Sequence, residues 1–394
     1  MRTAASQPHR LSQDRTIKIA YLAGTLSALG LVCLIVALAG YQVGYRTLWQ
    51  GLRMVVKPSE EVLVLPKSLL KELVDIRAVV DNAGNPTEQL SHYTMLVDRD
   101  PRLGWALIPN ARVSLYMLKA NNPMNFDPPV VALSADAKIS PALKAYLDQQ
   151  TRLRYSYSVG SDGFRTTLPK VEAEDRILMV GDSVLFGDGV NDDATMASQL
   201  QARVGNLIRV INAGVGGYSG EQALEMAKRE SESHRHRALV YVACQNDFMN
   251  QAGVSYLSQA ERILKMFASL RQQFSGKIVV ILQPYMEYVL DDVLQKGDWY
   301  REMVNETDCL REGLPSIARE LGLEYVDGTQ IFQDYMIQSG SVFSRFALFV
   351  DDAHLSPLGN RLASERIDAA LQKIGAYDEW RKTNASELRH QRGG

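Results

Sequence analysis

The sequence has few cysteines and no strong excess of either charge. Its three cysteines, Cys33, Cys244 and Cys309, are too scattered for a disulfide scaffold or a thiolate zinc site, which needs closely spaced pairs. The 43 lysines and arginines nearly balance the 45 aspartates and glutamates, which argues against a dedicated nucleic-acid surface. The 14 prolines and 28 glycines follow no period, and 46% of residues are hydrophobic, so collagen-like and disordered chains are excluded.

Long hydrophobic runs are also scarce, with one exception at residues 19–40. This segment has no charged side chain, and its 22 residues would form a helix long enough to cross a hydrocarbon core of about 30 Å. We therefore expect a single transmembrane helix, with residues 1–18 in the cytoplasm because slightly more positive charges precede it than follow it. A cleavable signal peptide is the alternative, although the run exceeds the usual ~7–15 residues. The remainder is then expected outside the inner membrane, in the periplasm or cell exterior.

The segment after this run is expected to lead into a larger domain. Residues 41–168 are predicted to be a juxtamembrane connector and a small accessory region, with turn-rich stretches and a weak strand pattern from Arg152 to Val159. Residues 377–394 are predicted to be a polar tail.

Residues 169–376 carry a different pattern, in which short apolar runs alternate with helical stretches. The predicted strands are 177–180, 208–211, 238–242, 278–282 and 324–326, and the predicted helices are 195–204, 221–230, 259–274, 309–321 and 360–374. Continuous runs of valine and isoleucine are typical of a parallel sheet covered on both faces. We therefore expect a three-layer α/β/α domain with right-handed crossovers.

Candidate functional residues lie just past the predicted strands, where a parallel sheet binds its ligands. Ser183 follows the first strand in a Gly-Asp-Ser motif, Gly217 ends the glycine-rich stretch after the second strand, and Asn246 follows the third strand. Asp351 and His354 precede the last helix. Each motif is common by chance, so their weight comes from occurring together in this order.

These residue types fit ester hydrolysis or acyl transfer. The weakly nucleophilic hydroxyl of Ser183 needs a neighbouring base, which His354 can supply. Asp351 lies three residues before this histidine, so a turn can bring its carboxylate to the imidazole. The backbone N–H groups of Gly217 and Ser183 and the side-chain amide of Asn246 can bind the oxyanion.

The set resembles the four motifs of the SGNH (GDSL) hydrolases. The resemblance implies that Ser183 is the nucleophile and that Gly217 and Asn246 form the oxyanion hole. It also implies that Asp351 and His354 complete a catalytic triad. No metal or cofactor is expected for this chemistry.

The resemblance covers about residues 174–374 and extends weakly into the segment before them. Leu103-Gly104-Trp105 and Asp162-Gly163-Phe164-Arg165 look like the lead-in of SGNH domains in bacterial surface-polysaccharide and envelope proteins. Two positions depart from the family pattern: Val184 replaces the usual leucine, and Cys244 stands where the third motif has glycine. The second departure affects the loop that carries the candidate oxyanion amide.

The leading hypothesis is a membrane-anchored serine esterase that hydrolyses acyl esters, above all acetyl esters, on an envelope carbohydrate, or on a lipid. One alternative is an O-acetyltransferase that uses the same triad and passes the acyl group to a polysaccharide. The other is a catalytically inactive SGNH binding module of an envelope complex, in which Ser183, Asp351 and His354 would not converge.

Three further residues are assigned lesser roles. Asp352 is the second candidate for the carboxylate partner of the catalytic histidine. His234 and His236 are expected to be surface residues, because their spacing in a charged connector fits neither one helix face nor a metal motif.

Overall fold

The computed structural model describes a core of the chain with several gaps. The described residues are 96–119, 130–134, 140–142, 145, 154–206, 208–248, 254–285, 298–339, 347–350 and 353–378. None of the helices in these ranges is both long and apolar enough to cross a membrane. The predicted anchor at 19–40 lies outside them, and so does the predicted polar tail at 377–394 except for its first two residues, of which Tyr377 is buried.

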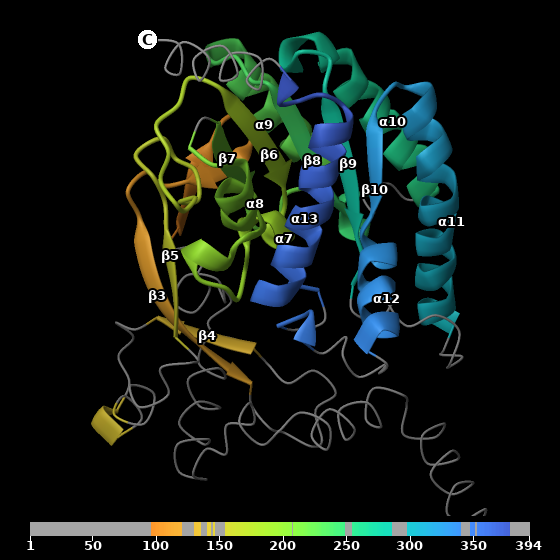
Figure 1. Ribbon diagram of the computed structural model, residues 1–394. Helices are drawn as coiled ribbons and strands as arrows, with labels where there is room; N and C mark the ends of the chain where they lie inside the picture. The colour runs from red at the N-terminus through yellow and green to blue at the C-terminus, as the bar shows by residue number, and fades with distance from the viewer. Residues whose placement is uncertain are drawn as a thin grey trace, which may run out of the picture. The chain divides into compact units, whose positions relative to one another are not determined.

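A five-stranded parallel sheet forms the centre of the fold (Figure 1). Its strands, in the order β10-β9-β8-β6-β7, are β6 (Arg176–Gly181), β7 (Arg209–Gly214), β8 (Ala238–Cys244), β9 (Ile278–Gln283) and β10 (Glu324–Asp327). Every residue of β8 and β9 is buried, as expected for strands with both faces covered. All five predicted strands are confirmed.

The helices form two groups around this sheet. They are α7 (Ser183–Phe186), α8 (Met196–Val204), α9 (Gly220–Ser233), α10 (Tyr256–Ser269), α11 (Asp298–Glu320), α12 (Gly328–Ser339) and α13 (Pro357–Lys373). Helices α8, α12 and α13 pack in one group, and α9, α10 and α11 in the other. Because the chain moves from β6 to β7 and then back past β6 to β8, right-handed crossovers put the two groups on opposite faces.

This reversal of direction creates a switch point at β6. In open α/β sheets, ligands bind at such a point, outside the carboxyl ends of the strands. The residue that follows β6 is Asp182, and Ser183 begins α7 directly after it. The topology therefore puts the Gly-Asp-Ser motif at the expected binding edge.

Three local features differ from the sequence predictions. The apolar pattern predicts neither α7, which has four residues, nor α12. The helix expected to begin at Cys309 begins at Asp298.

His236 is fully buried against Phe274, with ring centroids 5.6 Å apart, and burial lowers the pKa of this imidazole to about 4. The surface prediction for His236 is wrong because the 3-10 turn Arg271–Phe274, which follows α10, packs Phe274 against its ring.

The lead-in segment contributes two small antiparallel sheets. One pairs β1 (Val97–Asp100) with β2 (Gly104–Leu107), and the other has the order β4-β3-β5, with β3 (Arg112–Lys119), β4 (Val130–Ser134) and β5 (Arg154–Ser158). Strand β5 confirms the weak strand pattern. Leu103, Tyr157 and Phe164 belong to the same hydrophobic cluster as the central sheet, so the lead-in shares its core with the α/β domain.

Arg165 is the most unusual residue of this shared core, because its side chain is fully buried. Its Nε donates to Asp192 at 2.9 Å and its Nη2 donates to the carbonyl oxygen of Val190 at 3.1 Å. The guanidinium also lies over the rings of Tyr157 and Phe186, at 4.3 and 4.5 Å from their centroids. A buried charge is tolerated only with such partners, so Arg165 connects the lead-in to the loop after α7.

Replacing Arg165 by alanine should therefore destabilise the fold strongly. The substitution leaves a carboxylate and a carbonyl without their partner, and breaking a buried pair costs about 3–5 kcal/mol. We expect the thermal midpoint to fall by about 10 °C. In the control Arg361→Ala, the lost pair with Glu365 is half-exposed and should shift the midpoint by only about 1–2 °C. Equal shifts in the two variants would contradict the assigned role of Arg165.

Candidate active site

The candidate nucleophile is presented by a tight junction between β6 and α7. A Cβ at Gly181 would lie 2.6 Å from the carbonyl oxygen of Val242, so the strand end has room only for glycine. Asp182 caps the helix, because its carboxylate accepts from the backbone N–H of Val184 at 2.9 Å. Ser183 then occupies the first helical position and is half-buried between buried neighbours.

His354 reaches this serine from the loop before α13. That loop is held by two backbone bonds: the N–H of Val350 donates to the carbonyl oxygen of His354 at 2.9 Å, and the N–H of Ser356 donates to that of Leu348 at 2.9 Å. The imidazole Nε2 lies 2.8 Å from Ser183 Oγ, although the two residues are 171 positions apart. At this distance an unprotonated Nε2 accepts a hydrogen bond from the serine hydroxyl, which is the contact that a general base needs.

A carboxylate that the sequence motifs do not include lies near this imidazole. Asp351 and Asp352 lie outside the described residues, so Asp351 remains a prediction. Within the described part of the chain, Asp188 has its Oδ2 atom 4.0 Å from His354 Nε2. Asp188 lies five residues after Ser183, and no sequence motif singles it out.

Asn246 lies beside the nucleophile junction. It belongs to a short 3-10 turn, Gln245–Phe248, and its Nδ2 donates to Asp182 Oδ2 at 3.0 Å. A side-chain amide nitrogen carries two hydrogens, so this bond fixes the orientation of the amide and leaves the second hydrogen for an oxyanion. Cys244 at the family's glycine position therefore does not prevent the loop from bringing the amide to the site.

Two buried carboxylates support this turn. Asp247 accepts from the hydroxyl of Tyr241 at 3.1 Å and from the backbone N–H of Cys244 at 2.9 Å. Burial raises the pKa of Asp247 well above its usual value. Burial also raises the pKa of Asp182, and the hydrogen bonds from Asn246 and Val184 act in the opposite direction. These bonds favour keeping the negative charge on Asp182, which holds the candidate oxyanion amide.

Gly217 follows β7, the strand that pairs directly with β6. Its φ of +77° is a conformation that side-chain-bearing residues rarely adopt. The end of β7 is held against α7 by Asn212, whose Nδ2 donates to the carbonyl oxygen of Leu185 at 3.0 Å. On its outer side, the lead-in residue Trp105 lies against the glycine, because a Cβ at Gly217 would be 3.6 Å from the indole Cζ2.

The contacts of Trp105 are well defined. Its Nε1 donates to the carbonyl oxygen of Gly216 at 3.2 Å, and its own carbonyl oxygen accepts the hydroxyl of Tyr218 at 2.6 Å. The sequence placed Trp105 only in a lead-in motif and gave no sign that it borders the candidate oxyanion glycine. The order of the motifs along the chain does not predict such a contact.

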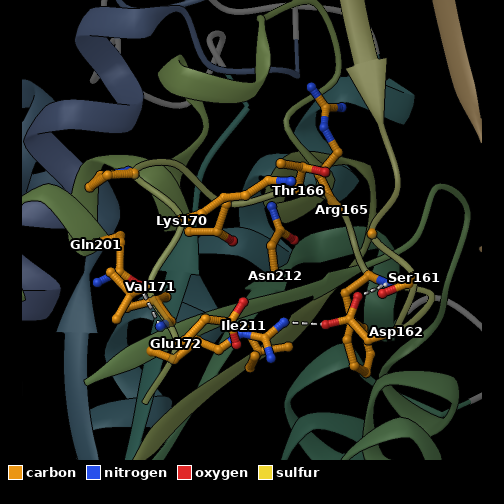
Figure 2. A pocket seen from close by; sticks show the side chains of 16 residues that line it. Ser161, Asp162, Arg165, Thr166, Lys170, Val171, Glu172, Gln201, Ile211 and Asn212 are labelled. Carbon is orange, nitrogen blue, oxygen red and sulfur yellow. Dashed lines mark hydrogen bonds and ion pairs between the residues drawn. The ribbon is translucent and has the colours of Figure 1, made fainter. Parts of the chain in front are cut away.

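A separate hollow lies at the outer edge of β7, where the lead-in crosses the strand (Figure 2). Asp162 and Arg209 form an ion pair at this hollow, and Figure 2 shows Lys170 and Glu172 among the residues that line it. None of the candidate site residues lines it. The chemistry predicted from the sequence therefore belongs to the carboxyl ends of the strands and not to this pocket.

The comparisons with known proteins agree with this arrangement. Residues 179–362, which include all the candidate site residues, match the model of the GDSL-like Lipase/Acylhydrolase family. None of the curated proteins matches the chain.

Several solved structures show a limited likeness. A carbohydrate acetylesterase family member from Sinorhizobium meliloti is 14% identical, with 51% of this chain and 98% of that chain covered and a TM-score of 0.38. A lipolytic G-D-S-L family protein from Veillonella parvula is 16% identical, with 51% and 98% covered and a TM-score of 0.37. A variant of an acetyl-xylooligosaccharide esterase from Geobacillus is 18% identical, with 52% and 96% covered and a TM-score of 0.37.

Fold and site together define an α/β protein with a parallel sheet, in which a serine at a strand end contacts a histidine as in a serine hydrolase. The family match identifies it further: the α/β domain belongs to the SGNH (GDSL) hydrolase superfamily, and the protein is an ester hydrolase of that type.

Truncating the candidate oxyanion amide should slow this hydrolysis. For Asn246→Ala we expect kcat to fall by about 10²–10³-fold with little change in KM, because the lost donor acts on the charge that develops in the transition state. Steady-state kinetics with a chromogenic ester measures both constants. As a control, Gln330→Ala removes an exposed amide on α12 and should change kcat less than twofold. A similar, small effect in both variants would remove Asn246 from the oxyanion hole.

Proposed function

We propose that this protein hydrolyses acetyl esters on an envelope carbohydrate through a serine acyl-enzyme. The contact of 2.8 Å between Ser183 Oγ and His354 Nε2 is the observation that carries the proposal. In this proposal Asp351 is the partner of the histidine, and the oxyanion donors are Gly217, Asn246 and the backbone N–H of Ser183.

The acylation step follows from the positions of these groups. His354 Nε2 removes the proton from Ser183 Oγ while this oxygen attacks the ester carbonyl carbon. The carbonyl oxygen becomes negatively charged and accepts from the backbone N–H groups and from the amide of Asn246. When the intermediate collapses, the C–O bond to the sugar breaks, and the histidine returns its proton to the departing sugar oxygen.

Deacylation repeats these steps with a new acceptor. His354 removes a proton from water, the hydroxide attacks the acetyl-serine, and acetate leaves as Ser183 regains its proton. A sugar hydroxyl in place of water would make the same site an O-acetyltransferase. The acceptor that reaches the acyl-enzyme thus determines whether the outcome is hydrolysis or transfer.

Two features support a carbohydrate ester over a lipid ester. The motifs of the lead-in resemble those that precede SGNH domains of surface-polysaccharide and envelope proteins, and this lead-in contributes Trp105 to the border of Gly217. The binding-module alternative expected Ser183 and His354 to lie apart, and their contact argues against it.

Replacing the nucleophile provides the direct test of the proposed mechanism. The purified full-length protein in mild detergent should hydrolyse 4-nitrophenyl acetate, and Ser183→Ala should lower kcat at least 10³-fold, because no acyl-enzyme can form. Ser269→Ala, an exposed serine on α10, is the matched control and should retain full activity. If Ser183→Ala retained activity as well, the proposed mechanism would be excluded.

The acceptor can be determined with the same preparation. An acetylated oligosaccharide incubated with an unacetylated one should yield free acetate, and mass spectrometry of the second sugar reports any acetyl transfer. Transfer that exceeds hydrolysis would replace the esterase assignment with the acetyltransferase.

We also propose that residues 19–40 anchor the protein in the inner membrane, with the α/β domain in the periplasm or cell exterior. Arginine near the middle of a span costs about 2.5–3.5 kcal/mol, so Val32→Arg with Ile35→Arg should move the protein from carbonate-washed membranes to the soluble fraction. Ile337→Arg is the control, because this side chain is 75% exposed in the described domain and should leave the distribution unchanged. A soluble, shortened wild-type chain would instead support the signal peptide.

A further inference from the structure

Asp188 lies beside the reacting nitrogen of the candidate base. Its Oδ2 is 4.0 Å from His354 Nε2, the same nitrogen that contacts Ser183 Oγ at 2.8 Å. The Asp188 side chain is only 7% exposed, so its attraction to the imidazole is weakly screened by solvent. A carboxylate at this position faces the nitrogen that becomes protonated when the serine attacks.

The lead-in strand β5 fixes this carboxylate. The hydroxyl of Tyr157 donates to Asp188 Oδ1 at 2.8 Å and accepts from the backbone N–H of Gly189 at 2.7 Å. Burial raises the pKa of Tyr157 well above its usual value, so the phenol stays protonated and remains a donor. The bond from Tyr157 orients the carboxylate, and the bond from Gly189 holds the tyrosine hydroxyl in place. The Oδ2 atom of Asp188 then faces the histidine.

The backbone around Asp188 is also constrained. Gly187 and Gly189 both have positive φ angles, +85° and +78°. A Cβ at Gly189 would lie 2.6 Å from a methyl group of Val350, four residues before His354. The loop is therefore confined between β5 and the segment that carries the imidazole.

We propose that Asp188 is a positioning residue for His354, held by Tyr157, and that it stabilises the imidazolium that forms when Nε2 takes the serine proton. The inference rests on the proposed function and deepens it. Asp188 takes no proton in this scheme: the proton moves from Ser183 Oγ to His354 Nε2 and then to the departing alcohol. Its effect is electrostatic, since a nearby opposite charge favours the protonated imidazole.

Other charged groups lie near Asp188 or near His354, in the structure or in the sequence. Asp182, at the N-terminus of α7, attracts the imidazole of His354 as well. Arg165 is buried behind Tyr157 and acts on Asp188. Asp351 and Asp352 precede the histidine in the chain and lie outside the described residues. Removing the carboxylate of Asp188 alone leaves all of these in place, so the change in the pKa of His354 isolates its contribution.

The pH dependence of serine reactivity tests the inference. The purified full-length protein is inactivated with a fluorophosphonate, and the inactivation rate follows the fraction of unprotonated His354. A carboxylate this close favours the protonated imidazole, so Asp188→Asn should shift the acidic limb of the pH–rate profile to lower pH by about one unit. The rate on the plateau should fall about tenfold, because the imidazolium loses a stabilising charge.

Two further variants separate electrostatics from loop structure. Tyr157→Phe retains the ring packing but removes the bond to Asp188, and it should shift the limb in the same direction by a smaller amount. Asp192→Asn is the matched control: this carboxylate lies on the same connection and binds Arg165, so its loss weakens the fold and leaves the limb in place. Thermal melting of each variant verifies that it is folded.

The outcomes distinguish this inference from the proposed function. If the wild-type protein does not react with the fluorophosphonate, or Ser183→Ala reacts equally well, the proposed function fails. If the wild-type serine reacts and Asp188→Asn leaves the limb unmoved, or moves it no more than Asp192→Asn does, the role of Asp188 is overturned. Should Asp188→Asn fail to fold, an unshifted limb in folded Tyr157→Phe overturns it instead.

Discussion

The parallel pairing of β6 with β7 on one side and β8 on the other is the constraint on which the candidate site depends. It aligns Gly181 with Gly214 and with Val242, so the loops after these three strands start at one edge of the sheet. The approach is close, because a Cβ at Gly214 would lie 2.4 Å from the backbone nitrogen of Phe186. Glycine at these strand ends allows α7 to start at once and present Ser183.

Buried charge organises the space beneath the nucleophile. Asp182 caps α7 and at the same time binds the amide of Asn246, so one carboxylate connects the first and third motifs. Asp247, equally buried, connects the turn that carries this amide to the end of β8 by accepting from the backbone N–H of Cys244. Burying a carboxylate is unfavourable without such bonds, and the bonds in turn limit the orientations available to the candidate oxyanion donor.

The lead-in is part of the functional unit and not a spacer. It places Trp105 against the second-motif glycine, Tyr157 on the carboxylate of Asp188 and the guanidinium of Arg165 beneath the loop after α7. Trp105 and Tyr157 come from two separate sheets of the lead-in, and Arg165 comes from the segment after β5. A fragment that begins at the first strand of the parallel sheet would therefore lack groups that shape the site.

The sequence by itself determined the five-stranded sheet and the candidate nucleophile, because buried parallel strands need continuous apolar runs and their carboxyl ends bind ligands. It paired Ser183 with His354 from the chemistry of a serine nucleophile and from the resemblance between motifs, without showing that the two side chains meet. The tertiary structure decided their distance of 2.8 Å, the approach of Asp188 and Tyr157, and the burial of His236. Each of these depends on segments far apart in the chain meeting in space, which local periodicity and short motifs do not encode.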